Sequence, residues 1–437
     1  MRKGPYFRNF HVAFTRFDKG DNDMKQLPSV VQRFLRYVAY DTEASDESTT
    51  YPSTEKQKEL GKVLVKELLE LGLHDAAMDD YGYVIATLPG NISNQSVPVI
   101  GFISHVDTSP DMSGKDVKPQ IHSNYQGGPI RLNDQYSITL DQSPILANHI
   151  GHTIITSDGT TLLGADDKAG IAEIMTMLEV LISDPSIRRG KIKVAFTCDE
   201  EVGGGTKYFD VQKFGAQYAY TVDGGGVLGE IENETFSADS AKIVFSGTNV
   251  HPGYAKGKLV NASKAASYFV TLFPDKKSPE HTEEREPYMH ITGMNSAVEK
   301  ATVTMILRAF DEEELMRQRK AIQEFAEETK KRFPKVGCEV NFSESYRNMK
   351  LIIDQHPEVL DVAMEAVKKS GMTPRLTSIR GGTDGATLSF KGLPTPNVFA
   401  GGNLFHSRFE WVAVEVMEQA VKTLVNIVRL WAERPKK

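Results

Sequence analysis

The sequence has little cysteine and no long apolar run, and each absence excludes a class of protein. Its two cysteines, Cys198 and Cys338, are too few and too far apart for a disulfide framework. No apolar run reaches the roughly 18 residues that a membrane-spanning helix needs. The sequence therefore predicts a cytoplasmic protein with no membrane partner.

Positive charge is also in short supply. Lys and Arg number 51 against 58 Asp and Glu, which gives a net charge of −7 at pH 7. Since binding to a phosphate backbone needs a basic surface, we expect no nucleic-acid partner. Basic residues do occur in segment 1–23, but no apolar run follows them as in a secretory signal. We expect this segment to be a disordered leader.

The remaining chain is long enough for two domains. Short apolar runs of strand length recur at 83–86, 97–103, 191–197 and 218–222, and a helical pattern covers 168–181. The same alternation resumes with a helix at 356–370, a strand at 397–400 and a helix at 410–431. This pattern predicts an α/β catalytic domain with a central mixed sheet flanked by helices, built from residues 24–234 and 346–437.

A different order of elements separates these two segments. Between residues 235 and 345 the pattern predicts strands at 242–245, 288–292, 298–308 and 338–342, with helices at 261–273 and 312–332. The order βαββαβ is that of a ferredoxin-like fold. We therefore expect an inserted second domain, which contains almost none of the candidate catalytic residues.

Those candidates follow the predicted strands. His105 and Asp107 are two residues apart at a strand end, so their side chains point to the same side. His105 could ligate a metal while Asp107 holds its other ring nitrogen. The alternative is a structural pair in which the two side chains only satisfy each other.

Acidic residues gather at two further points. Asp166 and Asp167 open a helix after Gly164, where carboxylates also serve as simple N-terminal caps. Asp199, Glu200 and Glu201 follow another strand, and three adjacent acids repel unless a cation or a shared proton relieves them. A solvated acidic loop is the alternative reading.

Two more ligand-type residues stand beside glycines after strands. Asp223 precedes Gly224, and His406 follows Gly401 and Gly402 by a few residues. Two histidines and several carboxylates suit Zn²⁺, and a carboxylate shared between two histidines suits a pair of ions. Together the five clusters predict a metal centre at one edge of the sheet.

In this order, the motifs resemble those of the co-catalytic zinc metallopeptidase family, which also holds aminoacylase and glutamate carboxypeptidase. The residues that carry the resemblance are His105–Asp107, Gly164–Lys168, Asp199–Gly203, Asp223–Gly224 and Asn403–His406. The resemblance spans the chain from Met24 and includes the insertion, which it identifies as a lid domain. It implies a two-zinc aminopeptidase that releases the N-terminal residue from tripeptides, in a possible homodimer.

The resemblance also implies a ligand set. His105 and Asp223 would hold one Zn²⁺ ion, Glu201 and His406 the other, and Asp166 would bridge the two. Co²⁺ or Mn²⁺ are the expected substitutes for zinc. The peptide bond between Asp166 and Asp167 is expected to be cis, as in the family.

Further roles follow from the same resemblance. Glu200 would be the general base, Asp107 would steady His105, and His251 would steady the oxyanion. Arg380 would grip the terminal carboxylate of the peptide, because a guanidinium suits bidentate recognition, with Arg308 and Asn348 also in the substrate site. A turn residue is the alternative for His251, and surface ion pairs are the alternative for the two arginines.

Two other functions stay open at this point. A dipeptidase, a carboxypeptidase or an N-acyl amino acid hydrolase would share the same metal centre, because specificity depends on lid contacts. A binding protein that keeps the fold without the metals is the non-catalytic alternative. The intact set of ligand residues argues against it.

Overall fold

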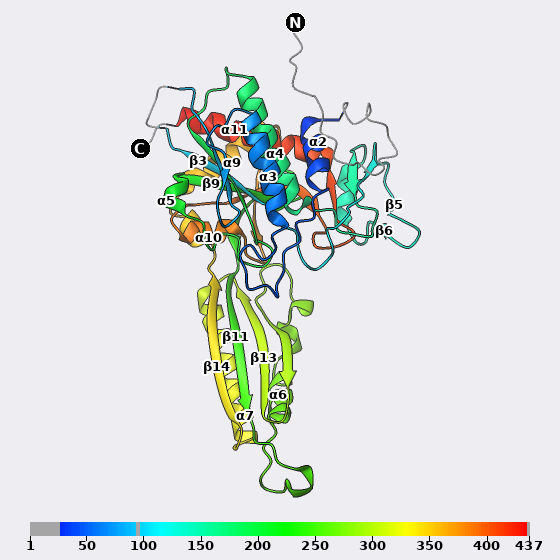
Figure 1. The fold of residues 1–437 in the computed structure, drawn as a ribbon, viewed down its shortest axis with the longest axis vertical. Coiled ribbons are helices and arrows are strands. Elements are labelled where there is room, and N and C mark those ends of the chain that lie inside the picture. Colours follow the sequence, from blue (N-terminus) through cyan, green and yellow to red (C-terminus); the bar gives the residue numbers. More distant parts are fainter. Residues whose placement is uncertain (1–26, 93–96, 435–437) are drawn as a thin grey trace.

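The computed structural model describes residues 27–92 and 97–434, so the predicted leader, residues 1–23, lies outside the described residues. Within them, the chain forms a large mixed sheet flanked by helices and a second, four-stranded sheet that extends from it (Figure 1). The predicted fold class is confirmed. None of the described helices is long and apolar enough to cross a membrane.

Eleven strands make up the large sheet, and its centre is parallel. β8, β3, β9 and β16 lie next to one another and run in the same direction. Their bounds are Ile192–Thr197, Ile100–His105, Tyr218–Gly225 and Asn397–Asn403. Because the carboxyl ends of parallel strands meet at one edge, residues that follow these strands come close together.

The outer strands are mostly antiparallel. On one side of the centre lie β1 (Ala77–Met78) and β2 (Val84–Leu88), and on the other lie β17 (Trp411–Ala413), β7 (Ile154–Thr156) and β4 (Gln120–His122). β10 (Glu230–Thr235) pairs with β16 and with β15 (Arg375–Ile379). A separate hairpin joins β5 (Ile130–Arg131) to β6 (Ser137–Ile138). The predicted helix at 410–431 is wrong at its start, because β17 comes first.

Helices cover both faces of this sheet. One face packs against α2 (Ser29–Tyr37), α3 (Gln57–Glu70), α4 (Ala165–Ser183), α9 (Pro357–Lys369) and α11 (Val414–Glu433). The other face packs against α5 (Val211–Phe214) and α10 (Asp384–Phe390). Neighbours on β3 show the division, since Phe102 faces the first group and Ile103 the second.

The second sheet has the order β12-β13-β11-β14, with all neighbours antiparallel. Its strands are β11 (Ser237–Ser246), β12 (Tyr288–Ser296), β13 (Lys300–Ala309) and β14 (Gly337–Tyr346). α6 (Ala262–Val270) and α7 (Glu312–Arg332) pack on one face around Phe245, Phe269 and Ile322. The chain order is βαββαβ, as predicted. The short helix α8 (Lys350–Ile353) follows where the chain returns to the large sheet.

Candidate metal centre and active site

The five predicted metal ligands come together in the structure. His105 ends β3, Asp166 begins α4, Glu201 follows β8, Asp223 lies on β9, and His406 follows β16. Their side chains form a continuous chain of short contacts across the carboxyl edge of the parallel strands. The edge is therefore a candidate metal centre.

Asp166 lies at the middle of this chain of contacts. Its Oδ1 is 2.9 Å from His105 Nε2, and its Oδ2 is 3.5 Å from His406 Nε2. His105 Nε2 is also 3.6 Å from Asp223 Oδ1, and His406 Nε2 is 2.8 Å from Glu201 Oε2. One carboxylate thus faces a His–acid pair on each side. The Asp166–Asp167 peptide bond is cis, as predicted.

Crowding and burial change the pKa values of these groups. Burial, with Asp166 adding, raises the pKa of Glu201 to about 8, and burial raises the pKa of Asp223 to about 6. Hydrogen bonds to Asp166 and Glu201 raise the pKa of His406 to about 11. Carboxylates packed this closely favour a positive charge among them.

The donor set fits divalent cations. His105, Asp166 and Glu201 offer ligand atoms that all lie within 4.8 Å of one another, and so do His105, Asp167 and Asp223. Glu201 Oε1 is buried without a hydrogen-bond partner among the described residues, as expected of an atom that awaits a cation. Asp167 differs from the other acids because both of its oxygens already accept backbone hydrogen bonds. Its Oδ2 accepts the backbone N–H of His105, and its Oδ1 accepts the backbone N–H of Gly170. Asp166, unlike Asp167, therefore has one carboxylate oxygen facing each histidine, and its role as a bridging ligand stays a prediction.

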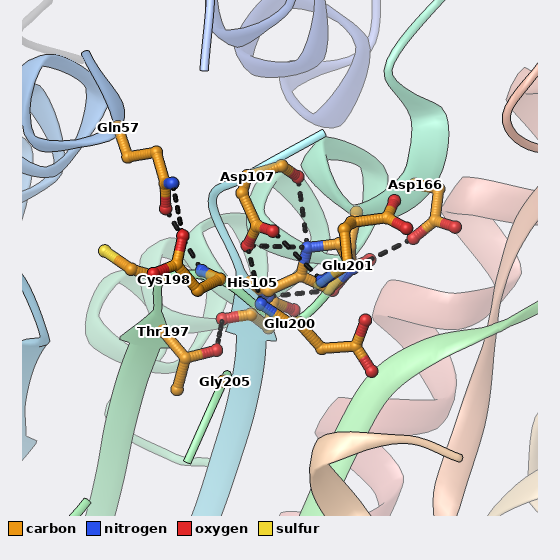
Figure 2. A network of polar contacts seen from close by, with 12 residues as sticks. Gln57, His105, Asp107, Asp166, Thr197, Cys198, Glu200, Glu201 and Gly205 are labelled. Atoms are coloured by element: carbon orange, nitrogen blue, oxygen red, sulfur yellow. Dashed lines mark hydrogen bonds and ion pairs between the residues drawn. The ribbon is translucent and has the colours of Figure 1, made fainter. Parts of the chain in front are cut away.

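Asp107 connects the histidine to the acidic loop. Its Oδ1 and Oδ2 accept the backbone N–H groups of Glu200 and Glu201 at 3.1 and 3.0 Å. His105 Nδ1 lies 3.1 Å from the Asp107 carbonyl oxygen and 3.4 Å from Oδ1. Figure 2 shows Asp107 between His105 and this backbone. The side chain is fully buried, so it holds both elements rigidly.

The three adjacent acids do not all face the centre. Asp199 adopts φ = 62° and turns toward the start of α3, where its Oδ1 accepts hydrogen bonds from the Ser53 hydroxyl at 2.5 Å and the Gln57 amide at 2.6 Å. The expectation of three crowded acids was therefore wrong for Asp199. Burial, together with Asp223 and Asp384, raises the pKa of Glu200 well above its usual range.

Arg380 lies at the contact between the two sheets. Its guanidinium donates to the carbonyl oxygens of Thr282, Glu284 and Glu286 at 2.8 to 3.2 Å. It also lies over the ring of Tyr288, 5.6 Å from the ring centre. In this structure Arg380 holds the loop that precedes β12, and its role in gripping a peptide carboxylate stays a prediction.

Arg308 and Asn348 lie in the same region. Arg308 donates to the Asp239 carbonyl oxygen at 3.3 Å and covers the ring of Tyr346 at 5.4 Å. Asn348 is buried and donates to Glu234 Oε1 and to the Phe310 carbonyl oxygen, both at 3.2 Å. The Asn348 contacts join the two sheets, whereas those of Arg308 lie within the second sheet. The predicted substrate contacts of both residues stay predictions.

The structure does not bring His251 to the metal centre. It follows β11, whose first residue lies beside the large sheet and whose ten residues span about 33 Å. The loop after β11 lies at the far end of the second sheet (Figure 1). There His251 is exposed, and its Nδ1 accepts the Gly253 N–H at 3.2 Å. Its role at the oxyanion stays a prediction.

Two residues near the centre were missed by the sequence analysis. Asp384 begins α10 and accepts the Thr197 hydroxyl at 2.7 Å, and burial raises its pKa to about 7. Glu410 is buried next to the loop that carries Asp166. The sequence offered a signal for each: Asp384 lies in a glycine-rich turn, and Glu410 follows His406 by four residues.

Comparison with known proteins agrees with this geometry. Residues 158–430 match the model of Peptidase family M20/M25/M40. A protein of Listeria welshimeri called Peptidase T is 47% identical over 93% of this chain and 99% of its own length. A Bacillus cereus protein of the same name is 47% identical over 94% of this chain and its whole length.

Solved structures share the fold of this chain. The aminopeptidase PepT of Bacillus cereus has a TM-score of 0.71 and 26% identity, and covers 93% of this chain and 98% of its own. A tripeptidase from Staphylococcus aureus has a TM-score of 0.72 at 22% identity, with the same coverage. A Bacillus subtilis protein described as a dinuclear metal binding peptidase of the M20 family has a TM-score of 0.61 at 15% identity, and covers 94% of this chain and 99% of its own.

Proposed function

Because the chain belongs to peptidase family M20/M25/M40, we propose that it is a two-zinc aminopeptidase that releases the N-terminal residue from tripeptides. The observation that carries the proposal is the position of Asp166, whose two carboxylate oxygens face His105 and His406. The relatives named Peptidase T support the substrate class.

The ligand assignment follows the contacts. His105 and Asp223 would hold one ion, Glu201 and His406 would hold the other, and Asp166 would serve both. A bound pair of zinc ions would supply an activated water and polarise the scissile carbonyl. Mixed imidazole and carboxylate donors suit Zn²⁺, with Co²⁺ or Mn²⁺ as substitutes.

Glu200 is our choice of general base. Asp107 accepts the backbone N–H groups of both Glu200 and Glu201 and so fixes the backbone of the two residues. Each side chain can therefore take a separate role. Glu201 contacts His406, whereas Glu200 would take a proton from water and pass it to the leaving amine. Its raised pKa fits that role, because a base is most effective when its pKa approaches the working pH.

A substrate panel tests the proposed specificity. Zinc-loaded protein should cleave a free tripeptide faster than the matching dipeptide, and should leave the N-acetylated tripeptide intact. Chromatography of the products gives the bond that is cut, and elemental analysis should give two zinc ions per chain. Faster cleavage of the dipeptide or the acetylated peptide would establish one of the alternative hydrolases instead. Fewer than one zinc per chain would favour a binding protein.

Replacement of the base tests the mechanism. Glu200→Gln should keep two zinc ions but lower kcat by about 10²–10⁴-fold, the usual contribution of general acid–base catalysis. Glu299→Gln is the matched control, because Glu299 is exposed in the turn between β12 and β13. A Glu200→Gln protein with parental kcat would refute the assignment.

A further inference from the structure

Glu410 is a buried acid between two functional segments. It stands four residues after His406 and directly before β17, and only 1% of its surface is exposed. A carboxylate this deeply buried needs several hydrogen bonds to remain stable. Its partners therefore indicate its purpose.

All hydrogen bonds of its side chain within the described residues go to one loop. Glu410 Oε2 accepts the N–H groups of Leu163 and Gly164, each at 2.7 Å. Glu410 Oε1 accepts the N–H of Asp166 at 3.0 Å. This loop leads into α4 and carries the carboxylate that faces both histidines.

The bonds connect segments that are far apart in sequence. Leu163 and Asp166 precede the second sheet in the chain, whereas His406 and Glu410 follow it. Hydrogen bonds to a charged acceptor are shorter and stronger than neutral ones, so three of them fix the loop firmly. The Asp166 backbone is thereby held in place relative to the turn that presents His406.

We propose that Glu410 is a positioning residue that sets the place of Asp166 between His105 and His406 and so determines the affinity for the pair of metal ions. This inference rests on the proposed function, since it needs a two-metal site. The observation behind it is independent of the proposed function, because the three N–H groups that donate to Glu410 are backbone groups and none is a metal-ligand atom.

Glu410→Gln is the sharpest test. Glutamine has the same shape, but its amide nitrogen is a donor, so it would face at least one backbone N–H and leave that group unpaired. Glu415→Gln is a matched control five residues away. Both oxygens of Glu415 accept one backbone N–H, that of Thr153 at 3.0 Å, in a segment that carries no metal ligand.

The measurement is metal binding, not turnover. Protein stripped with a chelator is titrated with Co²⁺, and affinity is obtained by competition with a chromophoric chelator while the visible spectrum reports ligand geometry. Loss of a group that orients a ligand typically costs 10–100-fold in affinity. We expect a loss in this range and an altered spectrum for Glu410→Gln, and parental values for Glu415→Gln.

Other results would overturn the inference. Parental affinity and spectrum in Glu410→Gln would refute it alone, provided that the parent binds two ions. An equal loss in Glu415→Gln would assign a general structural role to both acids. Failure of the parent to bind two ions would refute the proposed function as well. If Glu410→Gln does not fold, Glu410→Asp retains the charge but retracts the carboxylate, and parental metal affinity in that variant would refute the inference.

Discussion

Glu173 lies on α4 with its side chain fully buried, and neither carboxylate oxygen has a hydrogen-bond partner among the described residues. Burial raises the pKa of Glu173 well above its usual range, and the nearby Asp167 raises it further. The folded protein therefore keeps a proton on Glu173 at pH values where the unfolded chain has lost it. This acid makes the folded state less stable as pH rises.

Glu173→Gln should remove that pH dependence. Each pH unit above the ordinary pKa of glutamate costs the parent about 1.4 kcal/mol of unfolding free energy relative to the variant, until the raised pKa is reached. Urea denaturation of both proteins at pH 5.5 and pH 8 measures the difference. Glu179→Gln, on the same helix, is the control, because hydrogen bonds from Ser29 and Arg33 outweigh partial burial and lower the pKa of Glu179. Parallel profiles for parent and Glu173→Gln would contradict the prediction.

At this scale the sequence predicted which residues gather, but not every direction in which they point. His105, Glu201, Asp223 and His406 meet because each lies at or after the carboxyl end of a strand of one parallel set, and Asp166 joins them from the start of α4. Asp199 stands beside Glu200 in sequence yet turns away, because its positive φ and its partners on α3 are tertiary features. The position of a strand along the chain is visible in the periodicity of the sequence, whereas the direction of a single turned residue is not.

Among the secondary-structure elements, α4 packs unusually close to β9. A Cβ atom added at Gly170 would lie 1.8 Å from the Val222 carbonyl oxygen and 2.5 Å from Asp167 Oδ1. Backbone atoms cannot give way as a flexible side chain can. Glycine at this position therefore sets the distance between the helix that begins with Asp166 and the strand that carries Asp223.

Gly170→Ala should lower the unfolding free energy by about 3 kcal/mol or more, because overpacking a rigid contact is costly. Gly61→Ala is the matched control within another helix. Its added Cβ would meet Met78 Sδ at 2.9 Å, a flexible side-chain end, while alanine improves helix propensity by about 1 kcal/mol. Urea denaturation of both variants checks the contrast. Equal effects would show that the close approach at Gly170 is not rigid.

Short elements escaped the sequence analysis for a physical reason. The strand β17 has only three residues, too few for any periodicity, and the amphipathic pattern of α11 continues through it. Glu410 was therefore read as the first residue of a helix, and its place beside the metal loop was invisible. Longer periodic elements gave no such difficulty, and the predicted helix at 312–332 coincides with α7.

For the whole molecule, the buried acids of the candidate metal centre couple stability to pH. Without metal, burial is the main cause that raises the pKa of Asp223 to about 6 and the pKa of Glu201 to about 8. Both exceed the ordinary values, so the metal-free protein loses stability as pH rises from about 4 through about 8. Metal binding requires deprotonated ligands and becomes stronger over the same range.

The gap in melting temperature between zinc-loaded and chelator-treated protein should therefore widen from pH 5.5 to pH 8. Thermal unfolding followed by circular dichroism at three pH values measures it. Glu201→Gln should make the metal-free profile less steep up to about pH 8, because it removes one buried acid whose pKa is raised to about 8. A constant or narrowing gap in the parent would contradict this account. The predicted homodimer concerns two chains and stays a prediction, which light scattering would test.

The central position of β16 also has a consequence for synthesis of the chain. β16 pairs with β9 on one side and β17 on the other, yet its residues, 397–403, leave the ribosome only after the whole second sheet has been made. Until then β9 presents an open edge, a known site of wrong pairing between nascent chains. His406 emerges later still, so the proposed two-metal site would be complete only after β16 has been made.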